Sequence, residues 1–100
     1  MWTWHTRAAQ HQRVDISERF SKNLSSLRQA AGMSQEELAF RASIHRTQIS
    51  LMESGGRLPR LDTLVKLAGA LEVPIEKLLE GITWEPSVTR IGQFKVADPT

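Results

Sequence analysis

Residues 35–54 read QEELAFRASIHRTQISLMES, and this stretch decides the fold of the chain. Its apolar residues recur at helical spacing on both sides of positions 42–44, which indicates two short helices joined by a tight turn. Two helices that meet at a steep angle need a small residue where their backbones approach, and Ala39 stands there. The residues expected to lock the two helices together are Leu38, Ala42, Ile44, Ile49 and Met52.

The ends of these two helices carry their own signals. Ser34 has an acidic residue three positions later, Glu37, which is the pattern of a capping box and predicts a helix that begins after Ser34. The second helix is expected to run from His45 to Glu53, because the segment 54–56 reads Ser-Gly-Gly and stops it. Each helix of the pair is therefore expected to span about two turns.

The flanking sequence predicts three more helices. Before the pair, a helix from Ser17, with Ser17 as a candidate N-cap, ends at Gly32 and buries a stripe of Phe20, Leu24 and Leu27. After it, one helix follows Pro59 and a short one begins at Pro74 and ends at Gly81. The first of these two helices has Leu61, Leu64, Leu67, Ala68 and Leu71 at helical spacing, and in the second Ile75, Leu78 and Leu79 are expected to face inward. Five short helices predict an all-α domain over residues 17–81.

The two ends of the chain differ from this domain. Residues 1–16 are polar with scattered tryptophans and are interpreted as an N-terminal arm or an extra helix. Residues 82–100 are strand-prone and are interpreted as a C-terminal tail that forms a short extended segment or hairpin. An isolated hairpin is marginal in water, so an ordered tail is expected to pair with a partner chain or to pack on the helices. Trp84 is expected to pack against the helical core.

Composition limits the classes of function. The chain has 100 residues, no cysteine and a formal net charge of +2, which excludes a disulfide framework and a thiolate metal site. The charge is uneven: residues 1–60 hold nine basic and five acidic residues, and residues 61–100 hold four and six. A positive half suits a protein that presents one face to a polyanion. With no signal peptide and no long apolar run, a cytoplasmic location is expected.

The motif pattern resembles the XRE family, which includes phage repressors and Cro, over about residues 20–80. The matching segments are Leu27-Arg28, the run GMSQEELA at 32–39, Ile49-Ser50, Glu53-Ser54-Gly55, Pro59, Leu64, Leu67-Ala68, Ala70-Leu71 and Val73. The chain departs from the family at Ser43, where the turn usually carries glycine, and at Ser54, where Asn is common before Gly. A positive φ at Ser43 is expected to cost some strain. The resemblance implies a five-helix, phage-repressor-like DNA-binding domain.

The resemblance also implies which residues meet the bases. The helix from His45 to Glu53 would lie in the major groove of double-stranded DNA, with its N-terminal residues at base edges. The implied base contacts are Arg46, Thr47, Ser50 and Leu51. Arg46 can fork onto guanine O6 and N7, whereas Leu51, at a position where the family often has a polar reader, would touch a thymine methyl.

Backbone contacts and one structural ion pair follow from the same resemblance. The implied phosphate contacts are Gln35, His45, Arg57 and Arg60, with free N–H groups at the start of the helix that follows Ser34 favouring an anion. Arg28 and Glu53 are implied to form a partly buried ion pair that ties the first helix to the end of the recognition helix. We therefore expect the pair to orient the reading helix.

The expected function is that of a bacterial transcriptional regulator, a repressor by default, that binds a palindromic operator as a homodimer. The dimer surface is expected around residues 75–79, with the tail segment 82–96 as a further candidate. Two alternatives stay open: an antitoxin or other module that holds a partner protein through its arm or tail, and a restriction–modification controller protein.

Enzyme and metal-binding functions are disfavoured. His5, His11 and His45 lack an accompanying carboxylate or cysteine cluster, so no metal is expected. Glu36 and Glu37 are explained by the capping box and by the preference for acids in a first turn. We expect neither catalysis nor a cofactor.

Overall fold

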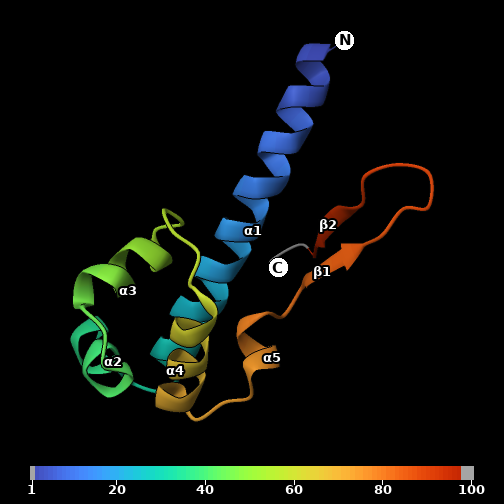
Figure 1. Ribbon diagram of the computed structural model, residues 1–100. Helices are drawn as coiled ribbons and strands as arrows, with labels where there is room; N and C mark the ends of the chain where they lie inside the picture. Colours follow the sequence, from blue (N-terminus) through green and yellow to red (C-terminus); the bar gives the residue numbers. More distant parts are fainter. Residues whose placement is uncertain (1, 98–100) are drawn as a thin grey trace.

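The computed structural model describes the backbone of residues 2–97 and the side chains of residues 16–97. Its elements in chain order are α1 (Trp2–Ala30), α2 (Gln35–Ala42), α3 (Arg46–Glu53), α4 (Leu61–Leu71), α5 (Ile75–Leu78), β1 (Ile82–Glu85) and β2 (Gln93–Val96). The helices α2 to α5 gather around the C-terminal half of α1, and residues 16–81 form the helical body (Figure 1). The expectation of five helices in a phage-repressor-like arrangement is confirmed. No helix of the described residues is both long and apolar enough to cross a bilayer.

The core draws on all five helices. Its fully buried large side chains are Phe20, Leu24, Leu38, Ile49, Met52, Leu67 and Leu78. These are residues that the helical periodicity placed inward, because side chains three and four positions apart share one face of a helix. The core sits where α3 and α5 pack on α1, where α2 packs on α3, and where α2 and α5 pack on α4.

The start of α1 differs from the sequence prediction. The helix begins at Trp2, so it runs through the expected boundary at residue 16, and Ser17 lies in its interior instead of capping it. No glycine or proline interrupts the sequence between residues 2 and 30, so nothing forces a break at Ser17. The end of α1 agrees with the prediction, since Gly32 adopts a φ of 70° and Met33 N donates to Arg28 O.

The turn between α2 and α3 is built on a left-handed serine. Ser43 has φ 57° and ψ 45°, and the next amide, Ile44 N, donates to Ala39 O at 3.0 Å. The strained conformation expected at Ser43 is therefore present, because the turn needs a residue with positive φ. At the other end of α2, the Ser34 hydroxyl accepts a hydrogen bond from Glu37 N at 3.0 Å. The Glu37 carboxylate accepts from Arg41 instead of completing the capping box.

Two leucines that stand at helical spacing in the sequence, Leu61 and Leu79, are exposed. Leu61 is 75% exposed because it is the first residue of α4, before the helix reaches the core. Leu79 is more than one-third exposed, since α5 ends at Leu78 and the chain leaves the helical path there. The inward orientation expected for Leu79 was wrong.

Residues 82–96 form the C-terminal hairpin. Its antiparallel register pairs Ile82 with Val96, Thr83 with Lys95, Trp84 with Phe94, and Glu85 with Gln93. The hairpin projects from the body beside α1, with β2 in contact with that helix (Figure 1). The expectation that Trp84 packs on the helical core was wrong: its ring meets Phe94 edge-on, with 4.9 Å between ring centroids, because the strand carries it beyond the body.

Side chains of α1 fix the base of the hairpin. Arg19 Nε donates to Glu80 O at 2.9 Å, and Asn23 Nδ2 donates to Leu78 O and Glu80 O, each at 2.9 Å. Gly81, with φ 85°, lies so close to Arg19 that an added Cβ would be 2.7 Å from its Nε. Asn23 thereby bonds carbonyls that the one-turn helix α5 leaves unsatisfied at its C-terminal end.

Candidate nucleic-acid interface

The helix α3 has one buried and one exposed face. Ile49 and Met52 are buried in the core, which fixes the rotation of the helix about its axis. The four residues predicted to meet bases, Arg46, Thr47, Ser50 and Leu51, are all exposed. A helix with a short polar face and a firmly packed apolar face has the dimensions that the major groove accepts. The base contacts themselves remain predictions.

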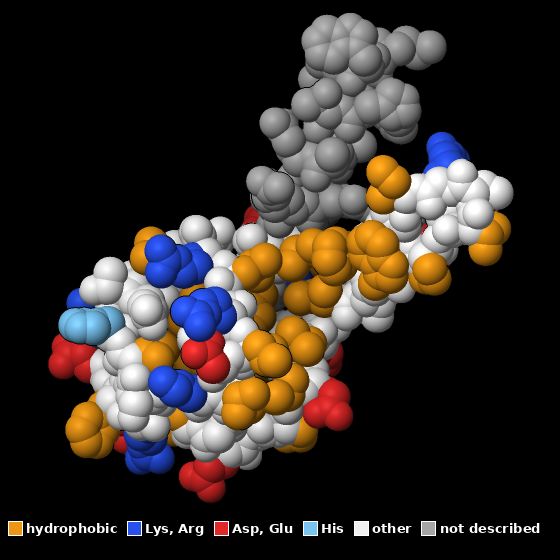
Figure 2. Space-filling model, viewed as in Figure 1, with side chains coloured by type: hydrophobic (Ala, Val, Ile, Leu, Met, Phe, Trp, Pro, Cys, Tyr) orange, Lys and Arg blue, Asp and Glu red, His pale blue; other side chains and the backbone are white. Residues whose placement is uncertain are grey.

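The predicted phosphate contacts surround this face. His45 is the exposed N-cap residue of α3 and makes no side-chain capping bond. Arg57 lies in the loop after α3, and Arg60 is the N-cap residue of α4, with its side chain 3.6 Å from Asp62 in an exposed ion pair. An ion pair this exposed leaves the guanidinium able to bind a phosphate. Figure 2 shows Lys, Arg and His side chains gathered on this part of the body.

The Gln35 side chain, predicted to contact a phosphate, is hydrogen-bonded within the protein. Its Nε2 donates to Glu53 Oε1 at 3.0 Å, so the amide links the start of α2 to the end of α3. A primary amide has two N–H donors, so one donor remains for a phosphate. The first backbone N–H groups of α2 also point out of the helix end, an arrangement that favours a negative charge there. Sequence reasoning missed the link to Glu53 because no local pattern encodes a contact 18 residues away.

Arg28 and Glu53 form a bidentate ion pair. Arg28 Nε lies 2.6 Å from Glu53 Oε2, and Nη2 donates to Oε1 at 3.0 Å. The two side chains are 14% and 8% exposed, and Arg28 also donates to Met33 O at 2.8 Å. The hydrogen bond with Glu53, aided by its charge, raises the pKa of Arg28 against the opposing effect of burial. The guanidinium therefore stays charged, and the pair ties α1 to the last turn of α3.

A shallow hollow separates α3 from the start of α4. It has a volume of about 60 Å³ and is lined by Gln48, Met52, Arg57, Leu58, Pro59, Arg60 and Thr63. Small-molecule sites span roughly 300–1,000 Å³, so this hollow is too small for an effector. Gln48 and Thr63 share its wall with both arginines, and no local pattern marks Thr63, because its place depends on how α4 docks.

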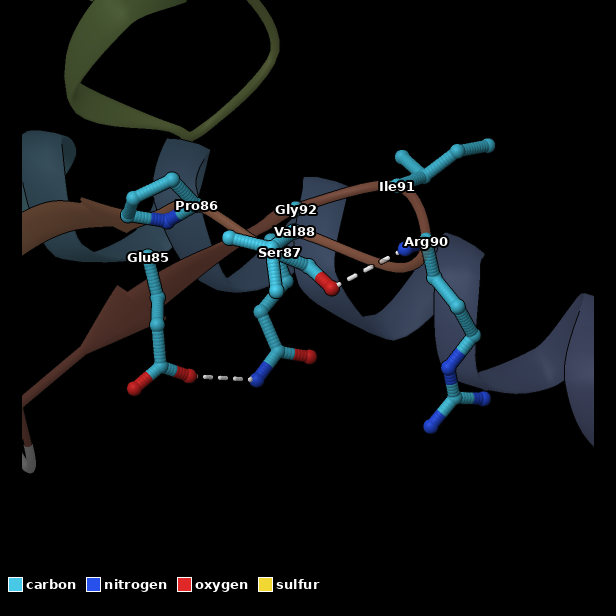
Figure 3. Close-up of a pocket in the computed structure, with 8 residues that line it drawn as sticks. Glu85, Pro86, Ser87, Val88, Arg90, Ile91 and Gly92 are labelled. Atoms are coloured by element: carbon cyan, nitrogen blue, oxygen red, sulfur yellow. Dashed lines mark hydrogen bonds between the residues drawn. The ribbon is translucent and has the colours of Figure 1, made fainter.

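The C-terminal hairpin encloses a larger concavity, of about 960 Å³, along residues 85–93 (Figure 3). Glu85 accepts a hydrogen bond from Gln93 Nε2 at 3.0 Å, and Arg90 N donates to Ser87 Oγ at 3.1 Å. Figure 3 shows the Ile91 and Arg90 side chains pointing away from each other and out of the loop. Because a single loop borders the concavity and its side chains do not converge, it lacks the features of a ligand pocket.

The histidines do not form a metal site within the part of the chain whose side chains are described. There, no three His, Asp or Glu side chains gather closely enough to hold an ion. His5 and His11 lie outside the residues with described side chains. His45 stands alone at the start of α3, where the XRE pattern implies a phosphate contact.

The helical body matches a known family. A family model described as helix-turn-helix matches residues 24–78, which include α2, α3, α4 and α5. This chain belongs to the helix-turn-helix family. The XRE resemblance and the expectation of a DNA-binding regulator are confirmed at the level of this helix-turn-helix family.

Two relatives are control proteins. The chain is 41% identical over 66 residues to control protein C.SmaI of Serratia marcescens, a match that covers 66% of this chain and 79% of that protein. It is 45% identical over 53 residues to control protein C.BamHI of Bacillus amyloliquefaciens. The second match covers 53% of this chain and 65% of that protein, just under two-thirds of its length.

Solved structures agree with this assignment. The restriction-modification controller protein C.AhdI from Aeromonas hydrophila has a TM-score of 0.61 at 37% identity, covering 62% of this chain and 94% of that one. The wild-type restriction-modification controller protein C.Esp1396I has a TM-score of 0.60 at 29% identity, covering 65% and 84%. More than a third of this helix-turn-helix chain therefore has no counterpart in the aligned part of C.AhdI.

Proposed function

We propose that this chain is the controller of a restriction–modification system and acts by binding an inverted-repeat operator as a homodimer. The observation that carries the proposal is the exposed face of α3, which presents Arg46, Thr47 and Ser50 and is held in place by the partly buried Arg28–Glu53 pair. The control-protein relatives favour the controller over the antitoxin among the alternatives that the sequence leaves open.

In this mechanism α3 enters the major groove with its N-terminal half toward the bases. Arg46 donates two hydrogen bonds to a guanine, the neighbouring hydroxyls of Thr47 and Ser50 meet adjacent bases, and Leu51 contacts a thymine methyl. His45, Arg57, Arg60 and the free donors at Gln35 contact phosphates. These contacts position the helix and supply the salt-dependent part of the affinity.

Two copies are needed for a usable specificity. One recognition helix reads about four to six base pairs, too few to define a site in a genome, and two helices about 34 Å apart read two half-sites one turn apart. In the proposed dimer, residues 75–79 lie at the two-fold axis. Binding over a promoter blocks polymerase, so repression is the default outcome. The chain acts in the cytoplasm through binding, without catalysis or a cofactor.

The test is selection of bound duplexes from a random DNA pool by the purified full chain at near-physiological salt. We expect enrichment of an inverted repeat whose half-site centres are about 10 base pairs apart. Recovery of sequences without any common motif, together with weak binding that disappears with added salt, would overturn the proposal. That result would favour the antitoxin alternative, in which the main ligand is a protein.

A further inference from the structure

The C-terminal hairpin separates apolar from polar residues completely. Cross-strand partners share a face of an antiparallel pair, and successive residues alternate between faces. The register therefore puts Ile82, Trp84, Phe94 and Val96 on one face, and Thr83, Glu85, Gln93 and Lys95 on the other. Such a division is typical of a sheet with one face against a core and one in water.

The apolar face is only partly covered. At the base of the hairpin, Ile82 packs against the body core. Further out, Trp84 is 52% exposed and Phe94 is 42% exposed, and Val88 and Ile91 in the connecting loop are almost fully exposed. A two-stranded hairpin is marginally stable at best in water, and aromatic side chains are the residues that most often anchor interfaces.

The hairpin is nevertheless held in a fixed direction. Arg19 and Asn23 bond the carbonyls just before it, and Ala97 N donates to Gly81 O at 2.7 Å where its two ends meet. At the far end the Trp84 ring lies over Gly92, where an added Cβ would be 2.6 Å from it. The half-exposed aromatic pair is thus presented in a defined place on the surface.

We propose that the apolar face of this hairpin docks on a second copy of this chain and forms an essential part of the dimer surface. The inference rests on the proposed function, which requires a dimer, and names the segment that makes it. In a two-fold dimer the same surface is used by both copies, so each hairpin lies against the partner's apolar surface beside the axis.

The size of the remaining surface supports a second copy as the occupant. A stable interface buries about 800 Å² per partner, which is more than a helix of four residues such as α5 can offer. Figure 2 shows hydrophobic side chains gathered on one side of the molecule, over α4 and α5 and along the hairpin. The exposed apolar side chains on these elements include Leu61, Val65, Leu79, Trp84 and Phe94. The apolar side visible in Figure 2 thus continues from the expected dimer helix onto the hairpin.

The place of the hairpin is compatible with DNA binding. It projects on the side of α1 away from α3 (Figure 1), so docking there leaves the recognition helix exposed. Pairing through a strand edge is less suitable than docking through the face, since the strands have four residues each and Pro86 follows β1 directly. The hairpin also lies outside the family match at residues 24–78, so that match does not predict its role.

The test is sedimentation equilibrium of the full chain, comparing the wild type with a Trp84→Ser/Phe94→Ser variant. We expect the dimer Kd to rise about 30-fold or more, the effect of losing an aromatic hot spot. The matched control, Thr83→Ala/Lys95→Gln, changes the opposite face of the same strands and should leave Kd within about threefold. An unchanged Kd in the Trp84/Phe94 variant would overturn the inference.

A second measurement does not depend on a destabilising variant. In a Trp2→Phe/Trp4→Phe chain, Trp84 is the single tryptophan. Its emission should shift to shorter wavelength, and acrylamide quenching should weaken, as the protein concentration rises through the dimer Kd. Emission and quenching that stay constant across that range, while sedimentation shows dimerisation, would place the interface elsewhere and overturn the inference.

The two proposals fail in different ways. If the wild type enriches an inverted repeat but the Trp84/Phe94 variant dimerises normally, the hairpin inference is wrong and the proposed function stands. If the wild type dimerises through Trp84 and Phe94 but enriches no DNA motif, the docking inference stands and the proposed function is wrong. A wild type that stays monomeric at all concentrations contradicts the docking inference.

Discussion

The helical body and the C-terminal hairpin treat apolar residues differently. In the body, Leu38, Ile49 and Leu67 are fully buried by residues of several helices, whereas Trp84 and Phe94 in the hairpin remain 52% and 42% exposed. The body thus buries its large apolar side chains within one chain, whereas the hairpin leaves its aromatic side chains about half exposed. The comparison teaches that stability resides in the body and that the hairpin gains its stabilisation from contacts outside its own strands.

The largest difference is expected in the free energy of unfolding when an ion pair is broken in the body or in the hairpin. Glu53→Gln removes the charge partner of the nearly buried Arg28 and should lower the free energy of unfolding by about 3–5 kcal/mol. The matched change in the hairpin is Glu85→Gln, which breaks an exposed pair with Lys95, 3.8 Å apart, and should cost less than about 1 kcal/mol. Urea unfolding followed by circular dichroism measures both. Equal losses would contradict the division between a stable body and a peripheral hairpin.

A smaller effect is expected on DNA affinity, which substitutions in the body should lower and a substitution in the hairpin should not. Arg46→Ala should weaken operator binding by about 1–3 kcal/mol and relax the preference at one base pair. Arg60→Ala should weaken all sequences alike and reduce the salt slope by about 1, because it removes a phosphate contact. Arg90→Ala, in the hairpin loop, should change neither the base preference nor the slope.

Fluorescence anisotropy titrations on the selected operator and on single-base variants, at several salt concentrations, test these three substitutions together. A changed base preference in Arg60→Ala would refute its assignment to a phosphate. An Arg46→Ala variant with unchanged affinity and preference would refute the assignment of the reading face.

The smallest effect concerns one residue of the body. Ser43→Gly should raise the free energy of unfolding by about 0.5–1 kcal/mol, because glycine adopts a φ of 57° without strain. The matched control is Ser26→Gly on the exposed face of α1, where the same change should lower stability by about 0.5 kcal/mol. Thermal unfolding that moves in the same direction for both variants would show that the turn stores no strain.

Sequence reasoning succeeded where local signals act over a few residues. The capping position of Ser34, the helix end at Gly32, and the buried faces of α2 and α3 all follow from patterns within one or two turns. The pairing of Arg28 with Glu53 came instead from the family pattern, since 25 residues separate them.

Prediction from the sequence failed where packing between distant parts of the chain decides the position of a residue. Ser17 lies inside a helix that no local breaker interrupts, and α5 ends at Leu78, before the predicted end at Gly81, so that Leu79 no longer faces the core. Trp84 was expected on the helices because a large aromatic residue is usually buried, but strand direction carries it outward. The bonds of Arg19 and Asn23 to the end of α5 span 55–61 residues, beyond any sequence period.

Those last bonds have a consequence for how the chain can change over evolutionary time. Their acceptors are the carbonyls of Leu78 and Glu80, which are main-chain atoms that precede the hairpin. They make no demand on the side chains that follow Gly81. The helical body is therefore closed by main-chain bonds before Gly81. A terminal segment after this junction can be lengthened, replaced or lost while the helix-turn-helix body keeps its shape. A regulator with such a junction can acquire a new self-association preference without altering the operator that it reads.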